Sequence, residues 1–452
     1  MAGKPPSAVA TFLLVALPAG LVLLVLTPPL QVPDELGHFL RAYQIAEGRL
    51  VAESREGLPG GTLPESLADQ ELAFPLRMRP LSRGELFRRA RHGLATPLAP
   101  EARRFVPFAS AAYSPVPYLP ASAVIAAGVT ASWSPLALLY AGRVATLLAA
   151  SLLTALALRV APAFRWPLAL LALTPMAAFL RSGLSADGMT NALAFLFFAL
   201  VLRLSTREGD VPSAGEKALV LTTSAALGLC KGSVLLLPLV LLVPARSVPR
   251  RRLAWSALLL GVAAFGGWWF VSRGLPAAPR FDVAVDAAEN LRSLLFRPRR
   301  FFGTLGSALA THPLRHFREL LGQLGWLDVR LPATLLSAVA AAILVLALAD
   351  GNGRLRLARW WRAGILLVLA ASVFSVYTVM FVIYTPAGAA AIEGMQGRYF
   401  IPLSPPALFL IVSRHPRIAL SEQAAARVAV LAAILGLAGA AWALWGRYVA
   451  PG

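Results

Sequence analysis

The residues best suited to chemistry stand directly after the first long apolar stretch of the chain: Asp34, Glu35, His38, Arg41 and Tyr43. On a helix, Asp34, His38 and Arg41 are spaced i, i+4 and i+7, so they share one face, and Glu35 borders that face. Carboxylates and imidazoles exchange protons, and guanidinium groups bind phosphate. This cluster is therefore well placed to bring a lipid phosphate and a polar acceptor together at a membrane surface.

A second interpretation of the two acids is purely structural. Pro33 suits a first helical turn and Gly48 a carboxyl cap, which predicts a helix over about 34–47. Acidic residues are common in a first turn, where Asp34 and Glu35 would interact with the helix dipole or cap free N–H groups. The polar residues elsewhere in the chain favour the functional interpretation over the cap.

Further polar residues are expected at the same face of a membrane bundle. Charged side chains at membrane boundaries are costly unless they are paired or solvated, and they are functional candidates for that reason. The alternative is that each one pairs or reaches for the interface without a role in chemistry. Their convergence on one side favours a shared cavity. These candidates are Arg143, Ser185, Asp187, Lys231, Arg398 and Tyr399.

The composition indicates a membrane protein. The chain has 452 residues, of which 58% are hydrophobic and only 14% charged, against about 25% charged in a soluble domain. Residues 8–30 carry no charge and no cleavage site follows them, which predicts a retained first span. The net charge of +20 is mostly arginine in short loops, as the positive-inside rule expects, and does not indicate nucleic-acid binding. The single cysteine, Cys230, excludes an intramolecular disulfide and any cysteine-based metal cluster.

Hydropathy and loop charge predict an all-α polytopic protein, a single membrane domain over 1–452, with its amino terminus inside the cell and its carboxyl terminus outside. Two long extracytoplasmic loops are expected, over 31–135 with an acidic motif and interfacial helices (one of them at 120–132), and over 274–330. The expected spans, about eleven in number, are 8–30, 136–158, 166–181, 187–203, 217–230, 233–245, 253–273, 331–349, 363–384, 399–413 and 426–446.

Several of these motifs resemble a bacterial family of uncharacterised polytopic proteins that is grouped with the GT-C glycosyltransferases. The resemblance spans most of the chain, and its layout is similar to that of protein mannosyltransferases and aminoarabinose transferases. The Lys-Gly element at 231–232, between two short expected spans, also resembles those enzymes. The matching motifs are Pro33-Asp34-Glu35 with His38 and Arg41-Ala42-Tyr43-Gln44, then Tyr113-Ser-Pro-Val-Pro-Tyr118, Ser185-Ala-Asp187, Gly325-Trp-Leu-Asp328 and Gln396-Gly-Arg398-Tyr399.

The resemblance implies an inverting glycosyltransferase of a bacterial inner membrane. It would move a sugar from a polyprenyl-phosphate donor to a hydroxyl of a glycan, lipid or protein acceptor on the extracytoplasmic face. Asp34 would be the general base, and Glu35 is the second residue assigned to catalysis. Glu35 or His38 would orient the acceptor, hold Asp34 or help to bind a metal. His38, Arg41, Tyr43, Ser185, Asp187 and Tyr399 are then expected to bind substrate, and Arg398, Lys231 and Arg143 to hold the leaving phosphate. Some relatives use a divalent cation such as Mg²⁺ or Mn²⁺, for which Asp34, Glu35 and His38 are the candidate ligands.

Two other classes of function explain the same pattern. A transporter or flippase of lipid-linked glycans would have polar residues in a cavity, but its acids should lie at mid-span depth. Asp34, Glu35 and Asp187 are expected at membrane boundaries, which favours surface chemistry. A polysaccharide polymerase or ligase would use a diphosphate-linked donor and would make a ladder of products instead of adding one sugar.

Overall fold

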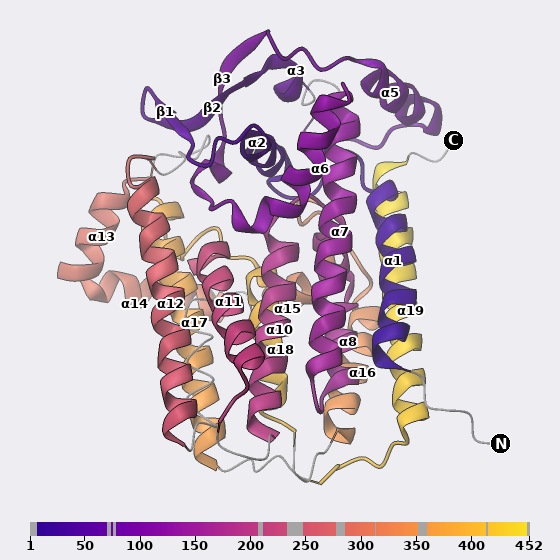
Figure 1. Cartoon of the computed structure of the whole chain (residues 1–452), viewed down its shortest axis with the longest axis vertical. Coiled ribbons are helices and arrows are strands. Elements are labelled where there is room, and N and C mark those ends of the chain that lie inside the picture. Colours follow the sequence, from indigo (N-terminus) through magenta and orange to yellow (C-terminus); the bar gives the residue numbers. More distant parts are fainter. Residues whose placement is uncertain are drawn as a thin grey trace.

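The structure, a computed structural model of the chain, describes residues 7–69, 74–75, 78–206, 211–232, 247–276, 285–311, 313–350, 359–412 and 415–449. Most of these residues are helical, and the long helices stand side by side as one bundle (Figure 1). Within the described part, six helices are long and apolar enough to cross a membrane: α1 (Ala8–Leu26), α7 (Pro135–Val160), α10 (Ala186–Thr206), α12 (Val248–Ser272), α17 (Arg359–Tyr384) and α19 (Glu422–Tyr448).

Two further helices match expected spans but are shorter than these six helices, with 17 residues each: α11 (Ala214–Cys230) and α16 (Ala333–Ala349). Elsewhere prolines interrupt the expected spans. The segment 166–181 forms two short helices, α8 (Arg165–Ala172) and α9 (Pro175–Ser182), with a new helix starting at Pro175. The segment 399–413 holds a 3₁₀ stretch, η5 (Gly397–Leu403), and the six-residue α18 (Ser404–Phe409). The expected span 233–245 lies outside the described residues.

The first long loop forms a layer over one end of the bundle (Figure 1). Helix α2 (Glu35–Ala46) confirms the helix expected at 34–47, and α6 (Leu119–Thr130) confirms the helix expected at 120–132. The layer also contains α3 (Glu65–Ala68), α5 (Arg83–Ala95), η1 (Ala109–Ala112) and η2 (Val116–Tyr118). A small antiparallel sheet in the order β1 (Glu53–Arg55), β2 (Leu58–Pro64) and β3 (Arg103–Pro107) was not among the expected elements.

The register of this sheet explains a glycine in β2. Gly60 pairs with Pro107, and a Cβ at Gly60 would lie 2.2 Å from the carbonyl oxygen of Val106. Only glycine permits such a close approach of two backbones. Glycine and proline are depleted in strands, so the sequence of β2 conceals the strand that it forms.

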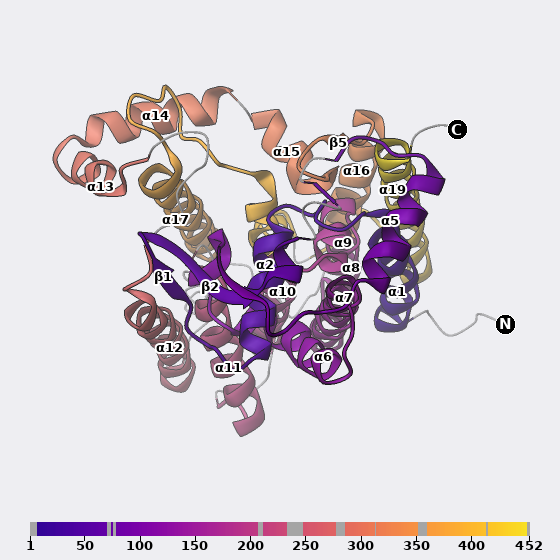
Figure 2. The same cartoon turned by 90° about the horizontal axis from the view of Figure 1, so that it is seen from above.

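The second long loop carries three helices and a hairpin: α13 (Ala287–Phe296), α14 (Pro298–Thr311), α15 (Pro313–Gly322), β4 (Gln323–Leu324) and β5 (Val329–Arg330). Seen from above, α13 and α14 lie at the edge of the molecule, whereas α15 lies closer to its middle (Figure 2). The hairpin turn needs left-handed backbone at Gly325 and Leu327, with φ of 61° and 63°. This loop therefore brings α15 and the hairpin to the end of the bundle where α2 begins.

Helix α10 is the central helix of the bundle. In its most apolar window, 89% of the residues are buried, compared with 28% in α1. Its first turn, which contains Asp187, lies at the same end of the bundle as α2. The opposite end is held by different contacts, in which Asp350 accepts a hydrogen bond from the backbone of Phe164 and Glu422 accepts one from the indole of Trp166.

Candidate functional site

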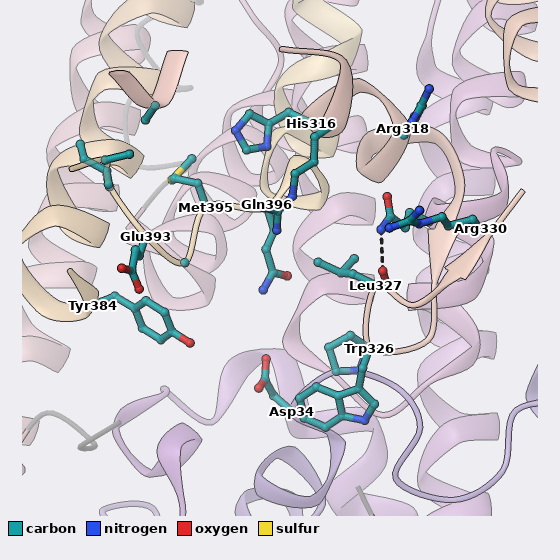
Figure 3. A pocket seen from close by; sticks show the side chains of 17 residues that line it. Asp34, His316, Arg318, Trp326, Leu327, Arg330, Tyr384, Glu393, Met395 and Gln396 are labelled. Atoms are coloured by element: carbon teal, nitrogen blue, oxygen red, sulfur yellow. Dashed lines mark hydrogen bonds between the residues drawn. The ribbon is translucent and has the colours of Figure 1, made fainter. Parts of the chain in front are cut away.

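A cavity of about 770 Å³ opens at the end of the bundle that the first loop covers. Its walls come from the start of α2, from α15 and the hairpin after it, from the end of α17, and from the segment before η5 (Figure 3). The chain segments that meet here are far apart in sequence. The polar and aromatic lining residues are Asp34, Arg315, His316, Arg318, Gln323, Trp326, Arg330, Tyr384, Glu393 and Gln396.

Asp34 stands at this cavity and does not act as a helix cap. It precedes α2 in a left-handed conformation, with φ of 63°, and its side chain makes no capping hydrogen bond. Its side chain is 54% exposed, and Oδ2 accepts a hydrogen bond of 3.0 Å from the guanidinium of Arg398. Within the described residues, Oδ1 has no hydrogen-bond partner. Asp34 therefore presents an anchored carboxylate with one oxygen available to a ligand.

Glu35, the next residue, has the opposite environment. Its side chain is fully buried and binds the equally buried Arg143, with Nε–Oε1 and NH2–Oε2 distances of 2.7 and 2.6 Å. The backbone N–H groups of Leu30 and Leu184 donate to the same carboxylate, at 2.9 and 3.1 Å. Neither oxygen of Glu35 faces the cavity.

Arg143 is equally saturated. Besides Glu35, its guanidinium donates to the carbonyl oxygens of Leu24, Thr27 and Pro28, at 3.1, 2.7 and 3.0 Å. A guanidinium has five N–H donors, and these contacts use all of them. Both side chains are therefore fully bonded within the fold, and the expected roles of Glu35 in catalysis and of Arg143 in binding phosphate stay predictions. The pair holds the turn after α1 against α7.

A chain of alternating charges extends inward from Asp34. Arg398 bonds Asp34 with one terminal nitrogen and approaches Asp187 with the other, at 3.3 Å. Asp187 in turn forms an ion pair with Lys231. The ring of Tyr399 lies 5.1 Å from the Lys231 ammonium and 5.4 Å from the Arg398 guanidinium. The structure thus brings these five predicted residues together, although only Asp34 lines the cavity.

His38, Arg41 and Tyr43 are buried away from the cavity. His38 Nδ1 lies 2.7 Å from the hydroxyl of Tyr118, and burial lowers the pKa of His38 to about 4, so its imidazole is neutral near pH 7. Arg41 donates to the carbonyl oxygens of Tyr113 and Leu50, at 3.0 and 2.5 Å. Through these contacts the segments 33–44 and 113–118 pack on each other. The expected substrate contacts of these three residues do not follow from their positions.

Ser185 lies away from the cavity, and the three expected metal ligands do not form one site. Ser185 is buried just before α10, and it does not line the cavity. Among the described residues, there is no group of three or more histidine, cysteine, aspartate or glutamate side chains that could hold a metal ion. Glu35 and His38 are each committed to buried partners. Asp34, Glu35 and His38 therefore do not fit a shared cation.

Glu319 on α15 organises the cavity wall, although no motif in the sequence singles it out. Its buried carboxylate accepts hydrogen bonds from Arg315, His316 and the backbone N–H of Gly397, at 2.7, 3.3 and 2.7 Å. Burial acts to raise the pKa of Glu319, but these hydrogen bonds outweigh burial and hold it below its usual value. A Cβ at Gly397 would lie 1.9 Å from the carbonyl oxygen of His316. Gly397 therefore lets α15 touch the segment that positions Arg398.

Trp326 was also missed as a site residue, although it belongs to a motif that the sequence analysis quoted. Its indole N–H donates to the carbonyl oxygen of Leu30, at 3.1 Å, which fixes the hairpin against the turn before Asp34. Asp328 of the same turn pairs with Arg447, at 2.7 Å. The available signal in the sequence was a tryptophan directly after a glycine, in the motif Gly325-Trp-Leu-Asp328.

The described part of the molecule is a mostly helical membrane protein, with a polar cavity at one end of its bundle and an exposed carboxylate at that cavity. A family model described as "Predicted membrane protein (DUF2142)" matches residues 17–407, and the chain belongs to this family. A search of curated proteins found no match, and neither did a search of solved structures.

Proposed function

We propose that this protein is a membrane-embedded glycosyltransferase of GT-C type, which transfers a sugar from a polyprenyl-phosphate donor to an acceptor hydroxyl with inversion. The observation that carries the proposal is the half-exposed carboxylate of Asp34 at a cavity of about 770 Å³. Its neighbour Glu35 is fully buried, so one acid of the pair is available for chemistry. A cavity of this size, at the end of a helical bundle and with a few convergent polar groups, is typical of a ligand site.

The chemistry needs one base and one cationic partner for the leaving group. The acceptor oxygen attacks the anomeric carbon, and the bond from that carbon to the phosphate oxygen breaks. Its electron pair leaves with the polyprenyl phosphate, and the acceptor proton passes to Oδ1 of Asp34. Arg398 orients Asp34, and its charge lies next to the position where phosphate charge develops. Lys231 pairs with Asp187, and Asp187 in turn pairs with Arg398, so Lys231 helps to fix the position of Arg398.

A lipid-linked donor is supported by a second cavity beside the first. It has a volume of about 350 Å³ and an almost wholly apolar lining between α15, α16, α17 and α18. Phe317, Leu320 and Leu321 of α15 face this cavity, whereas Arg315 and Arg318 face the polar one. Residues spaced in this way occupy opposite faces of a helix. One helix thus separates a site for a hydrocarbon chain from a site for polar groups.

The proposal includes the orientation expected from loop charge. The cavity would lie on the extracytoplasmic face of a bacterial inner membrane, with the amino terminus in the cytoplasm. Arg159, Arg165 and Arg203 lie at the ends of α7, α8 and α10 that point away from the cavity, as the positive-inside rule requires. The count of about eleven spans stays a prediction, with α8 to α9 and η5 to α18 crossing as broken helices.

The experiment is donor turnover by the purified protein with a panel of polyprenyl-phosphate sugars, in the wild type and in Asp34→Asn. We expect Asp34→Asn to lower the rate by about 10²- to 10⁴-fold, the usual contribution of a general base. Asp69→Asn is the matched control, because Asp69 is an exposed acid of the same loop that pairs with Arg104 away from the cavity. Unchanged transfer in Asp34→Asn would refute the assigned base.

A flippase of lipid-linked glycans is the second candidate, because the charges of the buried Asp187 and Arg398 and of the half-buried Lys231 lie inside the bundle, as charges do in transport pathways. If every donor stays intact while the lipid carrier still binds, the flippase becomes the better explanation. Movement of a lipid-linked sugar across vesicles, without any new glycosidic bond, would then be the positive evidence for it.

A further inference from the structure

The wall of the polar cavity formed by α15 and the following hairpin carries more positive charge than the proposed chemistry uses. Arg315 and His316 are held by Glu319, and Arg398 is held by Asp34 and Asp187. The side chains of Arg318 and Arg330 also line the cavity, and both residues are exposed. Within the described part of the chain, neither of these two side chains has a hydrogen bond or an ion pair.

The backbone that carries these two arginines is firmly held. Arg318 lies on α15, which Glu319 ties to the segment before Arg398 through the backbone of Gly397. Arg330 lies on β5, whose partner strand contains Gln323. The side chain of Gln323 closes the hairpin by donating to the carbonyl oxygen of Leu327. Two unpaired guanidinium groups therefore stand on an ordered wall and not on a mobile loop.

Trp326 gives this wall an aromatic surface. It lines the same cavity as Asp34, and its indole N–H is used by the carbonyl oxygen of Leu30, so the ring is oriented by the turn that leads into Asp34. Figure 3 shows the Trp326 ring beside the Asp34 carboxylate, with Arg330 and Arg318 further along the same wall. An oriented aromatic ring next to polar side chains suits the apolar face of a sugar ring.

We propose that α15 and the hairpin 323–330 form the acceptor subsite, and that the acceptor is an acidic saccharide. Trp326 carries a sugar ring with its hydroxyl toward Asp34, and Arg318 and Arg330, which line the same cavity, each bind a carboxylate of neighbouring residues of the glycan. Guanidinium groups bind carboxylates through paired hydrogen bonds, which a neutral sugar cannot replace. This inference rests on the proposed function, because it assigns an acceptor to the carboxylate of Asp34.

The test is equilibrium binding of tetragalacturonate and of its neutral methyl ester to the full-length protein in phosphatidylcholine nanodiscs, by titration calorimetry. We expect the acid to bind at least about tenfold more tightly than the ester. Arg318→Gln and Arg330→Gln should each weaken binding of the acid by about three- to tenfold, the range expected for one charge-assisted contact. Binding of the ester should stay unchanged. Arg299→Gln, which removes an exposed charge of the same loop away from the cavity, should change neither.

A variant of the aromatic wall separates stacking from charge. Trp326→Leu should weaken the acid and the ester by the same factor, because stacking does not depend on the carboxylate. Equal binding of the two oligosaccharides by the wild type would overturn the proposal. The proposal would also be overturned if Arg318→Gln and Arg330→Gln weakened binding of a polyprenyl phosphate only. Both arginines would then bind the phosphate of the donor.

The binding assay does not need turnover, so its failure is distinct from a failure of the proposed transferase. Asp34→Asn should keep the preference for the acid while it lowers transfer by about 10²- to 10⁴-fold. If no donor sugar is consumed and the preference still depends on Arg318 and Arg330, the acidic-saccharide site stands and the transferase does not. If a donor is consumed and the preference is absent, the transferase stands and the acceptor is not acidic.

Discussion

Asp34 and Glu35 are adjacent acids with opposite surroundings. Glu35 is enclosed by Arg143 and two backbone N–H groups and has no exposure, whereas the Asp34 side chain is 54% exposed and has one anchored oxygen. The left-handed backbone at Asp34 turns its side chain out of the face that Glu35 occupies. A pair of acids in a motif therefore need not share a role, since one can fix the scaffold while the other meets the ligand.

The largest expected effect concerns stability and tests the enclosed acid. Glu35→Gln should lower the free energy of unfolding by about 3–5 kcal/mol, because it leaves the Arg143 guanidinium buried without its countercharge. Thermal unfolding in nanodiscs measures the loss. The double variant Glu35→Leu with Arg143→Met should lose less than either single variant, because no charge then stays buried. A double variant that loses the sum of the two would show that the pair is not coupled.

The second prediction concerns Gly397, which lets α15 contact the segment that carries Arg398, the partner of Asp34. Gly397→Ala should lower stability by about 1–3 kcal/mol, the usual range for overpacking, because its Cβ would meet the carbonyl oxygen of His316 at 1.9 Å. It should also reduce donor turnover, since α15 would move away from the segment that carries Arg398. Gly303→Ala is the matched control, as a Cβ there has nothing within 4 Å. Normal stability and turnover in Gly397→Ala would remove Glu319 and Gly397 from the site.

The third prediction uses pH and the neutral histidine of α2. The pKa of His38 falls from 6.5 to about 4 on folding, because of burial. The unfolded chain therefore binds the additional proton between these values, so this group's contribution to stability is complete above pH 6.5 and is lost as pH falls toward 4. His38→Asn should have a smaller drop in melting temperature between pH 7 and 5 than the wild type. Equal drops would show that His38 does not carry this dependence.

The smallest expected effect is the stability change of Asp34→Asn. Its ion pair with Arg398 is partly exposed, and Arg398 keeps Asp187 as a partner. We expect a loss below about 1 kcal/mol, measured in the same unfolding experiment as Glu35→Gln. A loss as large as that of Glu35→Gln would erase the contrast between the two acids and would make Asp34 a structural residue.

Sequence reasoning succeeded where a physical signal is continuous along the chain. The ranges of α1, α7, α10, α12, α17 and α19 were expected to within a few residues, because long apolar runs identify them. The breaks at 173–175 and 402–406 were missed because the apolar pattern continues across the prolines there, and glycines concealed the small sheet. In the site, the gathering of Asp34, Asp187, Lys231 and Arg398 was anticipated from topology alone. The separate environments of Asp34 and Glu35 were not, because they depend on one backbone angle and on partners more than a hundred residues away.

The pairing of Glu35 with Arg143 has a consequence for how the chain enters the membrane. Glu35 is synthesised 108 residues before Arg143. Inserting an unpaired arginine at the centre of a span costs about 2.5–3.5 kcal/mol. The helix containing Arg143 therefore enters the bilayer at a penalty, which is relieved when Glu35 and the carbonyl groups at the end of α1 receive the guanidinium. Assembly of α1 with α7 thus removes the cost of inserting Arg143, and we expect a chain in which the two helices do not meet to keep an unpaired charge in lipid.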